Sequence, residues 1–173
     1  MWLNNNILDS AVDIHGFTMV QVDRDLKVSG KKKGRQVVLF VNHKWFNPED
    51  MTVKERICCH DIEMLAFRLR PYYVLREFSH VVVIIVYIPP RADAEPACDI
   101  VQSTVVRLQT QHPNTFVKIS GDFSHVTFTS HLNGFTQFVD CQTRNNMTID
   151  LLYANVKDAY ILICPVTTGQ IRS

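Results

Sequence analysis

Apolar and polar residues follow one another along this chain with the periods of several strands and one helix. In the first half, β-branched and aromatic residues form short segments separated by glycines and charged residues, which is typical of strands. These predicted strands cover residues 16–22, 36–42, 51–57, 62–69 and 81–88. Residues 81–88 (VVVIIVYI) are almost entirely apolar, so we expect a central strand that is covered on both faces and ends at Pro89.

The hydrophobic period changes after the Pro89-Pro90 pair. Between Ala92 and Gln111, apolar residues recur every three or four positions, which predicts an amphipathic helix. Two more strands are predicted over residues 116–120 and 148–153. Strands followed by a strand–helix–strand unit indicate an α/β sandwich with a mixed sheet. We expect a single domain, because no linker or repeat divides the 173 residues.

The charge and the cysteines narrow the classes of partner. The formal net charge is +1, so any binding of nucleic acid requires a shaped site rather than bulk positive charge. The five cysteines are odd in number, and two of them, Cys58 and Cys59, are adjacent, which suits no disulfide framework. The longest apolar run is far too short to cross a bilayer. We expect an intracellular protein of the nucleus or cytoplasm, without a membrane or a disulfide-linked partner.

A cluster of positive charge lies between the first two predicted strands. Lys31, Lys32 and Lys33 stand in the glycine-flanked segment SGKKKGR, which predicts a solvated hairpin loop. The lysines could contact a DNA backbone, with Lys32 and Lys33 as candidate contacts, or they could simply keep the loop soluble. Both interpretations remain open.

Three polar residues stand at or near the ends of apolar strands. Tyr87 lies near the end of the central strand, Asp122 follows the strand FVKIS, and Asp150 interrupts the apolar segment TIDLLY. Ligands of open α/β sheets bind beyond the carboxyl ends of strands, where such side chains converge. Two carboxylates and a phenol would suit metal-assisted attack on a phosphate ester. Alternatively, Asp150 caps a turn or pairs with Arg144.

Three segments together resemble a known family. The order VYIPP (residues 86–90), a helix, SGDFS (120–124) and TIDLLYANV (148–156) is similar to the exonuclease–endonuclease–phosphatase family. Within it, the chain most resembles the endonuclease domain of non-LTR (LINE-type) retrotransposon polyproteins of fishes. The resemblance covers residues 1–160, an incomplete domain, and leaves 161–173 as a tail outside the family. It implies an incomplete α/β sandwich with mixed, largely antiparallel sheets, Mg²⁺ as the cofactor and DNA as the partner.

The resemblance also assigns roles to residues. Asp122 matches the aspartate that handles the attacking water and contributes to the metal site, and Tyr87 matches the tyrosine that contacts the phosphate. Asp150 matches the aspartate that supports the active-site histidine. Thr143 and Arg144 resemble a P-T-R stretch beside the DNA-facing loops.

The chain departs from the family pattern at several catalytic positions. Ser124 stands where the motif has an asparagine, so a shorter hydroxyl replaces an amide. The metal-binding glutamate of the family precedes a TWL-like segment, and Met1-Trp2-Leu3 begins at that segment. The family's closing S-D-H-[NH] motif has no match in residues 161–173. We therefore expect a remnant nicking domain with little or no activity. The alternative is a non-catalytic nucleic-acid-binding or interaction module that uses the Lys31–Lys33 loop.

Overall fold

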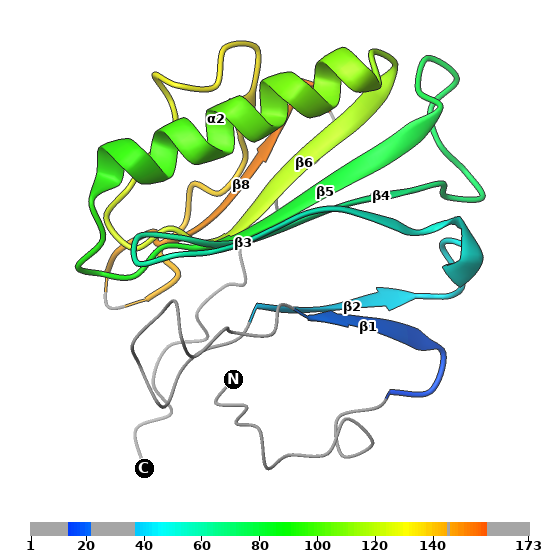
Figure 1. Cartoon of the computed structure of the whole chain (residues 1–173), viewed down its shortest axis with the longest axis horizontal. Coiled ribbons are helices and arrows are strands. Elements are labelled where there is room, and N and C mark those ends of the chain that lie inside the picture. Colours follow the sequence, from blue (N-terminus) through cyan, green and yellow to red (C-terminus); the bar gives the residue numbers. More distant parts are fainter. Residues whose placement is uncertain (1–13, 22–36, 145, 159–173) are drawn as a thin grey trace, which may run out of the picture.

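A six-stranded sheet with one long helix on one face forms the centre of the protein (Figure 1). The computed structural model describes residues 14–21, 37–144 and 146–158. The strands are β1 (Phe17–Gln21), β2 (Val38–Asn42), β3 (Thr52–Cys58), β4 (Glu63–Leu69), β5 (His80–Tyr87), β6 (Thr115–Asp122), β7 (Thr136–Gln137) and β8 (Asp150–Ala154). The helices are the short 3-10 helix η2 (Pro48–Asp50) and α2 (Ala94–Gln111).

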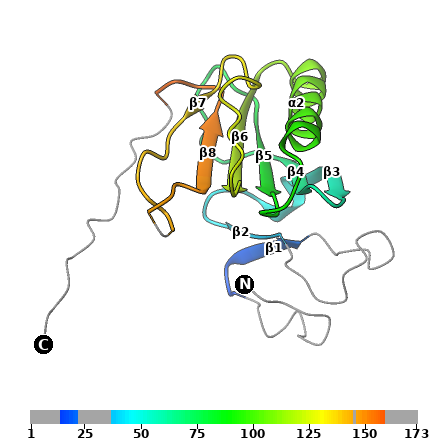
Figure 2. The same cartoon turned by 90° about the vertical axis from the view of Figure 1, so that its left-hand side faces the viewer.

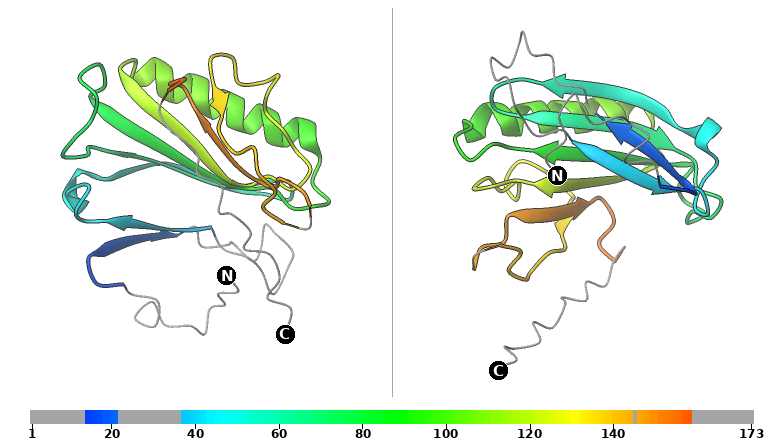
Figure 3. Two further views of the ribbon diagram at one scale, coloured as in Figure 1. Left: turned by 180° about the vertical axis from the view of Figure 1, so that it is seen from behind. Right: turned by 90° about the horizontal axis from the view of Figure 1, so that it is seen from below.

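The large sheet has the strand order β3-β4-β5-β6-β8-β7. Its pairs are antiparallel except for β5 and β6, which are joined through α2 and run parallel. Strands β1 and β2 form a separate antiparallel pair on the face opposite α2, against the β4–β5 part of the sheet (Figures 1 and 3). The α/β class with a mixed, largely antiparallel sheet, predicted from the sequence, is confirmed.

The apolar run of the central strand is explained by burial on both of its faces. Val82, Ile84 and Val86 belong to the core beneath α2. Val81 and Val83 point to the other face and pack in the core beneath β1 and β2. Because both faces of β5 are covered, the alternation typical of a half-exposed strand is absent from its sequence.

Helix α2 covers one face of the sheet along β5 and β6 (Figure 2). The carboxylate of Asp93 caps its first turn by accepting a hydrogen bond from the backbone N–H of Glu95, at 3.3 Å. The buried residues of α2 lie at helical spacings: Ala97, Cys98, Val101, Thr104, Val105 and Leu108. The predicted amphipathic helix is therefore confirmed, beginning two residues later than expected.

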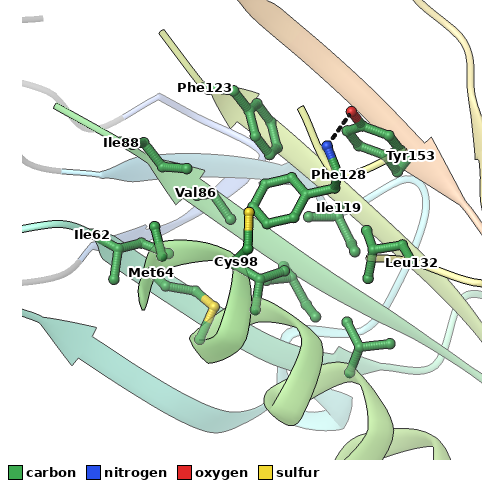
Figure 4. Packing of buried hydrophobic residues seen from close by; sticks show 14 of the residues in the cluster. Ile62, Met64, Val86, Ile88, Cys98, Ile119, Phe123, Phe128, Leu132 and Tyr153 are labelled. Atoms are coloured by element: carbon green, nitrogen blue, oxygen red, sulfur yellow. Dashed lines mark hydrogen bonds between the residues drawn. The ribbon is translucent and has the colours of Figure 1, made fainter. Parts of the chain in front are cut away.

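Three aromatic rings close the core at the side of β6 and β8. The rings of Phe123, Phe128 and Tyr153 pack edge to face, with centroids between 5.3 and 6.1 Å apart (Figure 4). The backbone N–H of Phe128 donates to the Tyr153 hydroxyl oxygen at 3.0 Å, and burial raises the pKa of that phenol. This cluster fixes the chain immediately after β6, where the candidate site begins.

The structure bears only in part on the expectations about membranes, disulfides and the Lys31–Lys33 loop. No helix in the described ranges is long and apolar enough to cross a membrane. The thiols of Cys58, Cys59, Cys98 and Cys141 are free. The Lys31–Lys33 segment and residues 161–173 lie outside the described residues, so their predicted roles are not tested.

The parallel pair β5–β6 requires a glycine at residue 121. Gly121 lies opposite Val86 in the register and has a φ of +151°, a conformation that side chains rarely adopt. A Cβ atom at this position would overlap the backbone carbonyl oxygen of Val86. Any larger residue would therefore push β6 away from β5, just before Tyr87 and Asp122.

Replacing this glycine should destabilise the fold strongly. We expect Gly121→Ala to lower the free energy of unfolding by about 3 kcal/mol or more, because backbone strain and the clash with Val86 add. Gly134→Ala is the matched control, since Gly134 has a φ of +81° but open space around its Cβ position, and strain alone should cost about 1–2 kcal/mol. Urea unfolding measures both. Equal losses for the two variants would contradict the close approach of the strands.

Candidate functional site

Four polar side chains form one row across the end of the large sheet. In the register, Glu63 lies opposite Tyr87, Tyr87 opposite Asp122, and Asp122 opposite Asp150. Register partners project from the same face of a sheet, and here that face is the one opposite α2. The sequence placed Tyr87, Asp122 and Asp150 at strand ends, and the structure brings them together.

Glu63 was missed by the sequence analysis. It is the first residue of β4 and is buried, although its side chain is an ionisable carboxyl group. The available signal was a glutamate at the head of the apolar strand EMLAFRL, a position where a charged side chain is rarely buried. Only the antiparallel register with β5 places it beside Tyr87.

Asp122 and Asp150 are close neighbours within the row. The backbone N–H of Phe123 donates to the carbonyl oxygen of Ile149 at 2.8 Å, so the two aspartates form a non-hydrogen-bonded pair of the ladder. In such pairs the Cα atoms lie about 4.5 Å apart and the side chains are at their closest. Two carboxylates in this position repel each other unless a positive charge lies beside them.

Arg144 supplies that positive charge. Its guanidinium Nη1 lies 3.5 Å from Oδ2 of Asp122. The sequence left open a pair between Arg144 and Asp150, whereas the ion pair that Arg144 makes in the described structure is with Asp122. Arg144 pairs with Asp122 because the turn that carries it folds back over the end of β6.

The turn is built by backbone hydrogen bonds and fastened to β8 by Thr143. The backbone N–H groups of Thr143 and Arg144 both donate to the Met147 carbonyl oxygen, and Met147 donates back to Arg144. The hydroxyl oxygen of Thr143 accepts from the N–H groups of Ile149 and Asp150, at 3.0 and 3.1 Å. Thr143 thus fixes the position of Arg144 relative to Asp122 and Asp150.

Ser124 directs its hydroxyl toward backbone rather than toward the open side of the row. Its backbone N–H donates to Oδ1 of Asp122 at 3.0 Å, and its Oγ donates to the carbonyl oxygen of Ile88 at 2.8 Å. Its φ of +52° is a conformation that favours asparagine over serine. The single hydroxyl proton is used by Ile88, so Ser124 fixes the loop and has no proton left to donate to a ligand.

The described donors do not form a metal site as they are arranged. Both carboxylate oxygens of Asp122 already accept hydrogen bonds, one from Ser124 and one from Arg144. In the described ranges, no group of three histidine, cysteine, aspartate or glutamate side chains is placed so that it could hold a metal ion, and this includes the three carboxylates of the row. A Mg²⁺ ion at Asp122 would compete with the Arg144 guanidinium for the same carboxylate. We therefore derive no chemical step through a metal.

A cavity of about 330 Å³ lies at the other end of the sheet. Its lining includes Val81 and Phe116, near the starts of β5 and β6, whereas the row occupies the ends of these strands. Trp45, Tyr73 and Phe78 contribute aromatic rings. None of the four row residues lines this cavity.

Removing the Thr143 hydroxyl should loosen the turn that holds Arg144. We expect Thr143→Val to lower the free energy of unfolding by about 1–2 kcal/mol, because two backbone N–H groups lose their acceptor. Thr143→Ser keeps the hydroxyl and should stay within about 0.5 kcal/mol of the parent chain. Urea unfolding compares the three proteins. A serine variant as unstable as the valine variant would show that the methyl group, not the hydroxyl, matters.

Comparisons with known proteins show no family. No family model and no curated protein matches the chain. Among solved structures, it is similar to a functionally unknown conserved protein from Enterococcus faecalis V583, with a TM-score of 0.47 and 12% identity. The match covers 80% of this chain and 64% of that one, so this chain spans less than two thirds of the length of its structural neighbour. A likeness at this level carries no argument about function.

Proposed function

We propose that the chain is an endonuclease-type domain of the exonuclease–endonuclease–phosphatase family, from a non-LTR retrotransposon, that contacts DNA but has little or no nicking activity. One observation carries the proposal. The segments on which the family resemblance rests lie far apart in sequence, yet each contributes one residue to the row: Tyr87, Asp122 and Asp150. Segments that matched by chance would have no reason to meet side by side on one face.

The row has the chemical groups that phosphodiester hydrolysis uses. A carboxylate such as Asp122 can accept a proton from an attacking water, and a phenol such as Tyr87 can donate to a phosphoryl oxygen. Arg144 is a cation beside Asp122, and guanidinium groups bind phosphate oxygens in a bidentate manner. These properties support the DNA backbone as the partner of this edge.

The contacts within the row argue against efficient catalysis. The Asp122 carboxylate already accepts hydrogen bonds from the Arg144 guanidinium and the Ser124 backbone N–H, and both donors would compete with an attacking water for its oxygens. The Ser124 hydroxyl donates to Ile88 rather than to a substrate. Losing one member of a cooperating catalytic set commonly costs several orders of magnitude in rate. The backbone still places the row residues side by side, and we propose that the row has lost most of its catalytic activity.

A plasmid-nicking assay tests the proposed loss of catalysis. We expect supercoiled DNA incubated with Mg²⁺ and the purified chain to nick no faster than with Asp122→Asn. Asp99→Asn is the matched control, because Asp99 is an exposed carboxylate on α2, on the other side of the sheet. Metal-dependent nicking by both the parent and Asp99→Asn, absent from Asp122→Asn, would overturn the proposed inactivity and leave the family assignment standing.

DNA affinity tests the proposed partner separately. Asp122→Asn removes a charge that repels phosphates, so we expect it to tighten DNA binding roughly two- to fivefold in fluorescence anisotropy. Arg144→Gln should weaken binding and reduce the slope of log affinity against log salt by about 1. Asp99→Asn should have no effect. If the parent retains no DNA, or if all variants bind equally, the DNA backbone does not use this edge and the proposal fails.

A further inference from the structure

Three unpaired polar atoms lie together at a corner far from the row. In the described part of the chain, the buried side-chain nitrogen and oxygen atoms without a hydrogen-bond partner are Nε of Arg68, Nε2 of His112 and Oγ1 of Thr115. Buried polar groups are nearly always hydrogen-bonded, so an unpaired one needs an explanation. Three of them in one place indicate a site for a ligand that accepts hydrogen bonds.

The geometry places these atoms around two histidine rings. Thr115 begins β6 and lies opposite His80, which begins β5. The ring centroids of His80 and His112 are 6.5 Å apart, with an interplanar angle of 41°. Arg68 lies on β4 opposite Val82, on the same α2-side face as His80. We call Arg68, His80, His112 and Thr115 the basic corner; it lies where α2 ends and β5 and β6 start (Figure 1).

The electrostatics of the basic corner favour an anion. Burial lowers the pKa of His80, and the positive charges of Arg68, Arg70, His112 and Lys54 lower it further. Burial also lowers the pKa of His112, with added contributions from Lys54 and Arg68. Burial is the largest cause of both shifts, and the charged groups that add to it, Lys54, Arg68 and Arg70, are all positive.

Two negative features nearby are weaker than this positive charge. Glu55 on β3 is already paired with Arg107 of α2, so it adds little net charge. The C-terminal end of α2 carries about half a negative charge, and the effect decays within one turn. Lys54, Arg68 and Arg70 bring three full positive charges. An anion is therefore favoured even at the end of this helix.

We propose that the basic corner binds an oxyanion of the phosphate class. Arg68 Nε–H, Thr115 Oγ–H and a protonated His112 Nε2 are all donors, so one tetrahedral oxyanion bound between them can satisfy all three. The same chemistry could come from free inorganic phosphate or from a phosphodiester of DNA. The site rests on its own contacts and does not depend on the proposed function of the row.

Oxyanion binding at this corner is coupled to uptake of a proton. His80 Nδ1 lies 2.9 Å from Ser79 Oγ, which is also 3.2 Å from the carbonyl oxygen of Asn114. A neutral imidazole has one donor and one acceptor nitrogen, so His80 donates from both nitrogens only when it is protonated. A bound anion raises the pKa values of His80 and His112, and its affinity rises as the pH falls.

Calorimetric titration of the full chain with inorganic phosphate, at constant ionic strength against chloride, tests the site. We expect Arg68→Met to weaken phosphate binding at least about tenfold, because a charged hydrogen bond is lost. Thr115→Val should weaken it severalfold while the unfolding free energy of the ligand-free protein stays equal or rises, since an unpaired buried hydroxyl is removed. Arg91→Met is the matched control and should bind like the parent, because Arg91 is exposed and precedes α2, at the end of the helix away from the basic corner.

The outcomes separate the sources of the oxyanion and the rival explanations. Saturable phosphate binding identifies a site for the free ion, whereas binding of short duplex DNA alone, lost in Arg68→Met and not in Arg91→Met, identifies a phosphodiester site. Sulfate, whose charge is constant near neutral pH, should bind more tightly as the pH falls from roughly 7.5 to 5.5. No anion-specific binding by phosphate or DNA, or equal losses in Arg68→Met and Arg91→Met, would overturn the proposal.

Discussion

The parallel pairing of β5 with β6 is the constraint on which the rest of the structure depends. The two strands approach so closely at Val86 and Gly121 that no side chain fits between them. This contact fixes the register that places Tyr87 beside Asp122. Because side chains alternate between faces, a shift of one residue would move the Asp122 carboxylate into the core beneath α2. The same register aligns His80 with Thr115 at the opposite end, so one strand pair positions both polar clusters.

Charge balance within the row links stability to the proposed loss of activity. Asp122 and Asp150 are neighbours on one face, and Arg144 lies where it offsets their repulsion. A catalytic carboxylate must remain available to a water or a cation, whereas one held by a guanidinium and a backbone N–H contributes mainly to the structure. The turn that presents Arg144 is itself fastened to β8 through Thr143, so the arrangement stabilises the edge of the sheet. The contacts of Arg144 and Ser124 thus stabilise this end of the sheet and at the same time occupy the Asp122 carboxylate.

Local patterns in the sequence predicted the parts of the fold that local physics decides. The apolar run of β5 follows from the burial of this strand on both faces of the sheet. The helical period of α2 follows from the burial of one face of the helix. The positions of Tyr87 and Asp122 at strand ends could be predicted from the apolar segments that precede them, which form β5 and β6. The pairing of Arg144 with Asp122 rather than Asp150 could not be predicted, because it depends on how a turn folds over a strand distant in sequence. The inclusion of Glu63 in the row and the basic corner likewise depend on register and helix placement, which no single segment specifies.

The most direct test that Asp122 and Asp150 lie side by side on one face is the proton–proton contact between strands β6 and β8 in solution. In a non-hydrogen-bonded antiparallel pair the two Cα atoms approach most closely, so the account predicts a strong nuclear Overhauser effect between the Hα protons of Asp122 and Asp150. Observation of that contact would confirm that both carboxylates project from one face. A strong Hα contact of Asp122 with Ile149 or Leu151 instead would place Asp150 on the opposite face and contradict the row on which the proposed function rests.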